Sequence, residues 1–132
     1  MKRKTFIKTI AALVSGTIVP LYIFRKKFGQ FYQPLKYPES LVQLFDKKAI
    51  TGLGVSYRSK HSSENDVSRL RQLLLADSEG KIYDEEEKIA LGEMLKKETK
   101  NDFETGKTAI VNGWVLSITE ARQCALFSLP GF

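Results

Sequence analysis

The segment that most restricts the fold lies near the C-terminal end of the chain, over residues 108–126. Asn112-Gly113 stands there between two runs of apolar, β-branched residues. This dipeptide favours a tight hairpin, because both central residues of a type I′ turn need a positive φ. The sequence therefore predicts a two-stranded hairpin over 108–116.

The same segment also carries the start signal of a helix. Ser117 and Glu120 have the spacing of a capping box, in which each side chain accepts a hydrogen bond from the other residue's main-chain N–H. Small and apolar residues follow over 121–127, and Pro130-Gly131 stops the helix. We expect this helix to close the domain directly after the hairpin.

Apolar side chains at helical spacing predict further helices between residues 38 and 105. Pro38 suits a first helical position, and a cap at 62–66 and another at Asp84/Glu87 open later helices, the last of which ends at a left-handed Gly106. The stripes expected to face the core are Leu41, Leu44, Phe45; Ile50, Leu53, Gly54, Tyr57; Val67, Leu70, Leu73, Leu74; and Ile89, Leu91, Met94, Leu95, Phe103. Gly54 is expected to let another helix approach closely.

The predicted fold is therefore all-α, a small bundle of four or five short helices with one β-hairpin, preceded by an N-terminal apolar leader or transmembrane helix. We divide the chain into a leader or anchor at 1–27, a linker at 28–37 and a helical domain at 38–132.

The net charge of +6 belongs to the leader. Seven of the 21 Lys and Arg residues lie in 1–27, which hold no Asp or Glu, so the remaining 14 cations face all 15 acids. A domain this close to neutral does not favour binding to a phosphate backbone, so no nucleic-acid partner is expected.

The leader itself has a basic start, an uncharged run over 9–24 and a basic triplet at 25–27. Sixteen helical residues span about 24 Å, and flanking Lys and Arg side chains can reach the headgroups of a bilayer. The basic start resembles a twin-arginine export motif with the second arginine replaced by lysine; its targeting residues are Arg3, Lys4, Phe6, Ile7 and Lys8. No Ala-x-Ala site follows the apolar run, which favours an uncleaved anchor over a cleaved signal. We expect a bacterial inner-membrane location with the domain on the periplasmic side.

The sequence offers few groups for chemistry. The single cysteine, Cys124, excludes an internal disulfide and a cysteine metal cage, and the single histidine, His61, excludes a histidine-pair zinc site. Acidic residues at 85–87 and at Asp102/Glu104 are more typical of helix termini and solvated surface than of a catalytic pair. We therefore predict no catalytic, metal or cofactor-binding residue in this chain.

Three residues of the closing segment are candidate partner contacts: Trp114, Arg122 and Gln123. Tryptophan and arginine are enriched in binding hot spots. The alternative for Trp114 is that it covers the core, and the apolar Val115 and Leu116 beside it favour that structural role. Arg122 can bond either the hairpin or a carboxylate of a partner.

The leader, together with the run from Gly113 to Leu126, resembles a group of small exported bacterial proteins with twin-arginine-type leaders. These are broadly similar to the small third subunits of membrane-bound flavin dehydrogenases of the gluconate 2-dehydrogenase type. The resemblance covers about the first 25 and the last 25 residues. It implies a non-catalytic accessory subunit that escorts or anchors a larger oxidoreductase subunit at the membrane, with the flavin in that partner. The alternative is an independent membrane-anchored interaction or envelope-structure protein without a redox partner.

Overall fold

The computed structural model describes residues 33–130 of the chain. The predicted leader, with its targeting residues Arg3, Lys4, Phe6, Ile7 and Lys8, lies outside the described residues. Within residues 33–130, no helix combines the length and the apolar character that a membrane crossing requires.

Helices dominate the described part, with one two-stranded antiparallel hairpin, as the sequence predicts. In chain order the elements are η1 (Pro34–Lys36), α2 (Glu39–Val42), α3 (Lys47–Lys60), η2 (Ser62–Glu64), α4 (Val67–Leu75), α5 (Lys88–Thr105), β1 (Thr108–Val111), β2 (Trp114–Ser117) and α6 (Ile118–Phe127).

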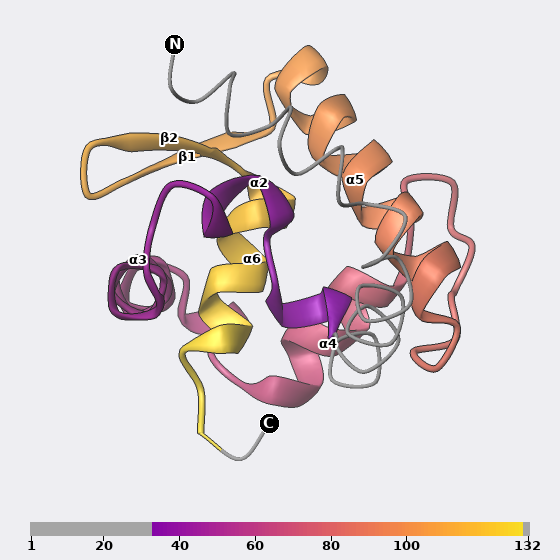
Figure 1. Ribbon diagram of the computed structural model, residues 1–132, viewed down its shortest axis with the longest axis horizontal. Coiled ribbons are helices and arrows are strands. Elements are labelled where there is room, and N and C mark those ends of the chain that lie inside the picture. The colour runs from indigo at the N-terminus through magenta and orange to yellow at the C-terminus, as the bar shows by residue number, and fades with distance from the viewer. Residues whose placement is uncertain (1–32, 131–132) are drawn as a thin grey trace, which may run out of the picture. The chain divides into compact units, whose positions relative to one another are not determined.

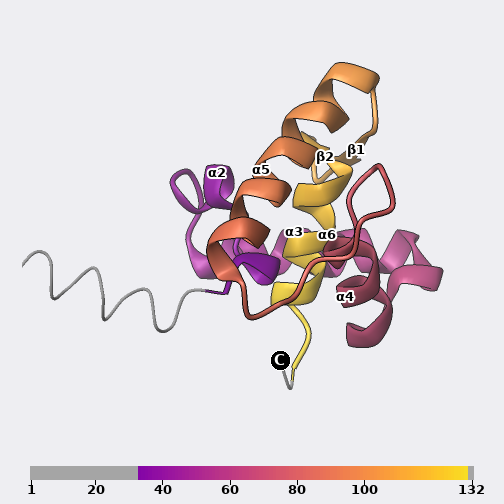
Figure 2. The same ribbon diagram turned by 90° about the vertical axis from the view of Figure 1, so that its right-hand side faces the viewer.

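The closing helix α6 is the centre of the domain. In Figures 1 and 2 its yellow ribbon runs through the middle, with α3, α4 and α5 around it. These three helices and η1 all pack on α6. Seven of its ten residues are buried, so its small side chains form a surface that α3, α4, α5 and η1 share. The core cluster around it comprises Leu35, Leu41, Ile50, Leu53, Tyr57, Leu70, Leu74, Leu91, Met94, Leu95, Val111, Leu116, Ala121, Cys124, Ala125 and Leu126.

The start of α6 is fixed as the capping box predicts. Ser117 Oγ accepts a hydrogen bond from the Glu120 N–H at 2.9 Å, and Glu120 Oε1 accepts one from the Ser117 N–H at 3.0 Å. The helix begins at Ile118, three residues earlier than predicted. The hydroxyl of Ser40 donates to the second carboxylate oxygen of Glu120, which joins α2 to the same helix end.

The α3 stripe is also confirmed. Ile50, Leu53, Gly54 and Tyr57 are all buried, and a Cβ built on Gly54 would collide with the main chain of Cys124 in α6. The side chain of Asp46 caps this helix by accepting a hydrogen bond from the Ala49 N–H at 2.8 Å.

Two predicted apolar stripes are partly wrong. The first predicted helix is a four-residue turn, α2, with Pro38 as its N-cap, and Leu44 beyond its end is 72% exposed. In the longer helix, Ile89 is 85% exposed and Phe103 is also exposed. The residues of α5 that face the other elements are Leu91, Met94, Leu95 and Asp102, whereas Ile89 and Phe103 lie on the solvent side of the helix.

The α5 helix begins at Lys88, and Glu87 makes no side-chain cap there. The predicted cap residue Asp84 instead accepts a hydrogen bond from the Glu86 N–H at 3.0 Å, which closes a local turn before the helix. Gly106 does end α5 in the left-handed conformation, with φ of 78°.

The domain starts before its predicted boundary. Pro34 and Leu35, placed in the linker by the sequence reading, are buried in the domain. The side-chain amide of Gln123 in α6 donates to the Pro34 carbonyl oxygen at 2.7 Å, and this bond holds the segment against the core.

Candidate interaction surface

The β1–β2 hairpin presents a group of exposed apolar side chains that lie next to one another. Its turn has the predicted geometry, with φ of 51° at Asn112 and 85° at Gly113. The Ser56 hydroxyl of α3 donates to Asn112 Oδ1 at 2.9 Å, which holds the turn beside that helix. The hairpin is therefore a fixed element with a defined position, shown in orange in Figure 1.

The two faces of the hairpin have different environments. Side chains alternate between faces along a strand, so Val111 and Leu116 point one way and Ile110 and Val115 the other. Val111 and Leu116 are buried in the core. Ile110 and Val115 stand directly opposite each other in the register and are 70% and 57% exposed. The outer face of the hairpin thus presents an aliphatic pair to solvent.

Trp114 shares the inner face but sits at the turn, beyond the end of the core. It is 51% exposed, and its ring meets Phe45 edge to face, with 5.0 Å between the ring centroids. Trp114 therefore covers the core with only about half of its surface, and its ring packs against Phe45 at the tip of the hairpin. We call Ile110, Trp114 and Val115 together the hairpin surface.

Arg122, predicted to bond the hairpin or a partner, is bonded inside the domain instead. Its guanidinium binds the Glu64 carboxylate through two hydrogen bonds, at 2.9 Å from Nε and 3.2 Å from the terminal nitrogen. The Tyr57 hydroxyl donates to the same carboxylate at 2.9 Å. This cluster could not be predicted from the sequence, because 58 residues separate Glu64 from Arg122.

The pKa values of the cluster follow from this geometry. Partial burial alone would raise the pKa of Glu64, but the hydrogen bonds from Arg122 and Tyr57 outweigh it and hold the pKa below its usual value. Burial, reinforced by the hydrogen bond to Glu64, raises the pKa of Tyr57. The carboxylate is thus held ionised and the phenol neutral, as suits a structural link between η2, α3 and α6.

Gln123, the third candidate contact, is buried, with its amide engaged by Pro34 as described above. Of the three candidate partner contacts, Trp114 is the one whose side chain presents a large surface to solvent.

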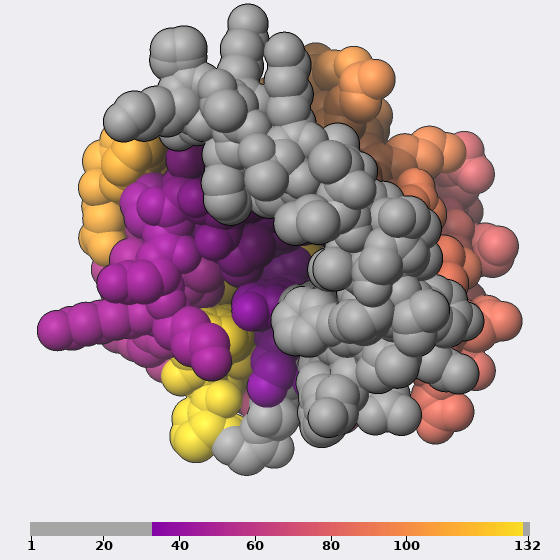
Figure 3. Space-filling model, viewed as in Figure 1, coloured from indigo at the N-terminus to yellow at the C-terminus, as the bar shows by residue number. Residues whose placement is uncertain are grey.

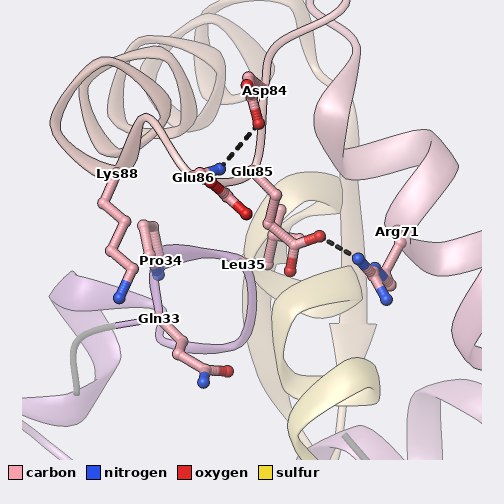
Figure 4. A pocket seen from close by; sticks show the side chains of 8 residues that line it. All are labelled: Gln33, Pro34, Leu35, Arg71, Asp84, Glu85, Glu86 and Lys88. Atoms are coloured by element: carbon pink, nitrogen blue, oxygen red, sulfur yellow. Dashed lines mark hydrogen bonds and ion pairs between the residues drawn. The ribbon is translucent and has the colours of Figure 1, made fainter. Parts of the chain in front are cut away.

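The acidic residues before α5 line a cavity of about 700 Å³ with Gln33, Pro34, Leu35, Arg71 and Lys88 (Figure 4). In Figure 4, Glu85 points across to Arg71 of α4, and the two form an ion pair. Asp102 is elsewhere and buried; its Oδ2 accepts hydrogen bonds from the Thr119 N–H at 2.9 Å and the Thr119 hydroxyl at 2.7 Å. The carboxylates of Glu85 and Asp102 thus each join two elements of the fold.

Cys124 is buried against α3. Burial, with a smaller contribution from the charge of Glu120, raises the pKa of its thiol to about 12. A thiol with that pKa holds almost no thiolate at neutral pH, and thiolate is the reactive form. Over residues 33–130, no group of three or more His, Cys, Asp or Glu residues has the arrangement of a metal site.

Comparisons of the chain with models of protein families, with curated proteins and with solved structures found no match.

Proposed function

We propose that this chain is a non-catalytic accessory subunit that escorts or anchors a larger, exported flavin-dependent dehydrogenase at the bacterial inner membrane. In this proposal the leader targets the chain to the membrane, the helical domain lies on the periplasmic side, and the larger subunit holds the flavin. The resemblance of the leader and of the segment 113–126 supplies the identity of the partner.

The observation that carries the binding role is the hairpin surface. An isoleucine and a valine paired across two strands, with a half-exposed tryptophan at the turn, are held rigidly by the capped α6 and by the bond from Ser56 to Asn112. Rigid apolar and aromatic side chains that need no reordering lose little entropy when a partner covers them. Such residues are typical of the buried centre of a protein interface, where Trp is enriched.

The test is purification of the tagged full-length chain from membranes of its native host, with identification of what copurifies. We expect a larger polypeptide that carries flavin. Combining Ile110→Ser with Trp114→Ala should weaken that association by at least about 30-fold, the equivalent of a 2 kcal/mol hot spot. Ile89→Ser is the matched control, because it removes an exposed isoleucine at the start of α5, the end of that helix away from the hairpin.

Two results would reject the proposal. A copurifying partner without flavin would show that the partner is not a flavin-dependent dehydrogenase. A flavoprotein that binds the hairpin variant as tightly as the parent would show that the hairpin surface is not the binding site. Purification of the chain with no stoichiometric partner would favour the alternative, an independent membrane-anchored envelope protein.

A further inference from the structure

Helix α3 carries only positive charge. Its fourteen residues include Lys47, Lys48, Arg58 and Lys60 and no Asp or Glu. The rest of residues 33–132 holds ten Lys and Arg against 15 Asp and Glu, a net charge of −5, and its densest acidic run lies over 84–87, in the segment that leads into α5. The charge of the domain is thus unevenly distributed, with a basic helix at one place on its surface.

Packing on α6 decides which side of α3 faces outward. The stripe from Ile50 to Tyr57 is buried, so Lys48, Gly52, Val55 and Ser59 lie on the opposite side of the helix. Lys47 and Lys60 are exposed at its two ends. In Figure 1, α3 is seen end-on at the periphery of the domain, and in Figure 3 its magenta atoms lie at the surface. We call Lys47, Lys48, Val55 and Lys60 the basic α3 face.

The charges of this face are not neutralised within the described domain. Arg58 is occupied by Ser128 and Asn65, at 2.9 and 2.8 Å, but the three lysines form no ion pair with any residue of 33–130. The nearest acid in sequence, Asp46, is engaged as the N-cap of the helix. Three lysines that make no ion pair, on the same helix as an exposed valine, match a surface that is anionic with an apolar layer beneath it.

The length of the chain before the domain favours a bilayer as that surface. If the uncharged run over 9–24 lies in a membrane, the nine residues from 25 to 33 extend at most about 30 Å. A domain of about 100 residues has a radius of gyration of about 13 Å. The domain is therefore confined to the bilayer surface, where tethering gives even a weak contact a high effective concentration.

We propose that the basic α3 face binds the phosphate headgroups of anionic lipids and so orients the domain on the membrane. Each lysine near an anionic bilayer strengthens binding about fivefold, so the three together shift the docking equilibrium roughly 100-fold. Val55 adds apolar contact below the headgroups. This contact determines which side of the domain faces the bilayer. The leader attaches the chain to the membrane but does not determine that orientation.

The test uses the full-length chain in vesicles of phosphatidylglycerol and phosphatidylcholine that carry a spin-labelled lipid in both leaflets. A fluorophore is attached through Val55→Cys on the basic α3 face or, as the reference position, through Ile82→Cys, an exposed residue in the loop between α4 and α5. Cys124 is buried and stays unlabelled. We expect the lipid to quench the label at position 55 much more strongly than the label at position 82, and added salt to reduce this difference.

Reversing the three lysines with Lys47→Glu, Lys48→Glu and Lys60→Glu should abolish the difference between the two positions. The charge-matched control reverses three exposed lysines elsewhere, Lys81, Lys97 and Lys100, and should preserve it. Equal quenching at the two positions, an unchanged difference after reversal of the α3 lysines, or failure of the chain to associate with the vesicles would overturn the proposal. Because the vesicles contain no other protein, this outcome is independent of whether a flavoprotein binds the hairpin surface.

Discussion

Gly54 of α3 lies directly against the carbonyl group of Cys124 in α6. A Cβ at Gly54 would stand 2.0 Å from that carbonyl oxygen and 2.6 Å from its carbon, well inside any permitted contact. The two helices therefore approach each other more closely than any residue with a side chain would allow. Because the obstacle is main chain, no rotation of a side chain can relieve it.

The first prediction concerns this contact. Gly54→Ala should lower the free energy of unfolding by roughly 1–3 kcal/mol or more, because α3 and α6 must move apart to admit the methyl group. Gly52→Ala, two residues away on the exposed side of the same helix, has nothing within 4 Å of the new Cβ. It should instead raise stability by about 0.5–1 kcal/mol, through the better helix propensity of alanine. Chemical denaturation of the two variants measures both values, and equal effects would contradict the close approach.

The second prediction concerns the half-exposed tryptophan. A fully buried Trp114 would cost roughly 3–5 kcal/mol on replacement by alanine. Since half of the side chain is exposed and the ring makes an edge-to-face contact with Phe45, we expect about 1–2 kcal/mol. Phe45→Leu should remove the same ring contact. The double variant should therefore lose less free energy of unfolding than the sum of the losses in the two single variants. Thermal melts of both single variants and the double variant give the answer.

The third prediction is a pH dependence of stability that arises from Glu64. Its pKa is lower in the folded domain than in the unfolded chain, so its contribution is fully present above the unfolded value, about 4.3, and is lost as the pH falls through the folded value. Glu64→Gln should therefore be less stable than the parent at pH 7, by roughly 1–3 kcal/mol. The difference should shrink steadily below about pH 4. A constant difference across the acid range would exclude the ionised link to Arg122.

The fourth prediction concerns the reactivity of Cys124. In the native protein a thiol reagent at neutral pH should modify this residue only as fast as the domain unfolds, because the sulfur is buried and its pKa is raised to about 12. In denaturant the same thiol should react at the rate of a free cysteine. Rapid modification of the folded chain would show that α3 and α6 separate readily.

Features encoded by neighbouring residues could be predicted from the sequence. The Asn112-Gly113 turn, the Ser117/Glu120 box and the left-handed Gly106 each depend on a few adjacent positions whose stereochemistry has one favoured solution. The stripe of α3 was also predicted correctly, because this helix packs chiefly on one partner, α6. Local rules determine these elements almost alone.

Features that depend on distant partners could not be predicted. Ile89 and Phe103 are expected on the buried side of α5, yet that side is formed by Leu91, Met94, Leu95 and Asp102, so the other two side chains remain exposed. Arg122 was expected to bond the hairpin or a partner, because nothing near it in sequence points to Glu64. The exposed half of Trp114 depends on how far the core extends beneath the hairpin, which is a property of the tertiary structure.

The central position of α6 has a consequence for how the domain opens. Helices α3, α4 and α5 pack on α6 and hardly on one another, so each of them loses a large part of its packing once that helix is displaced. Local opening is then confined to the periphery, and the amides of α6 exchange with solvent only when the whole domain unfolds. The slowest-exchanging amides in the chain should accordingly belong to residues 121–126, and their exchange rates should report the global free energy of unfolding.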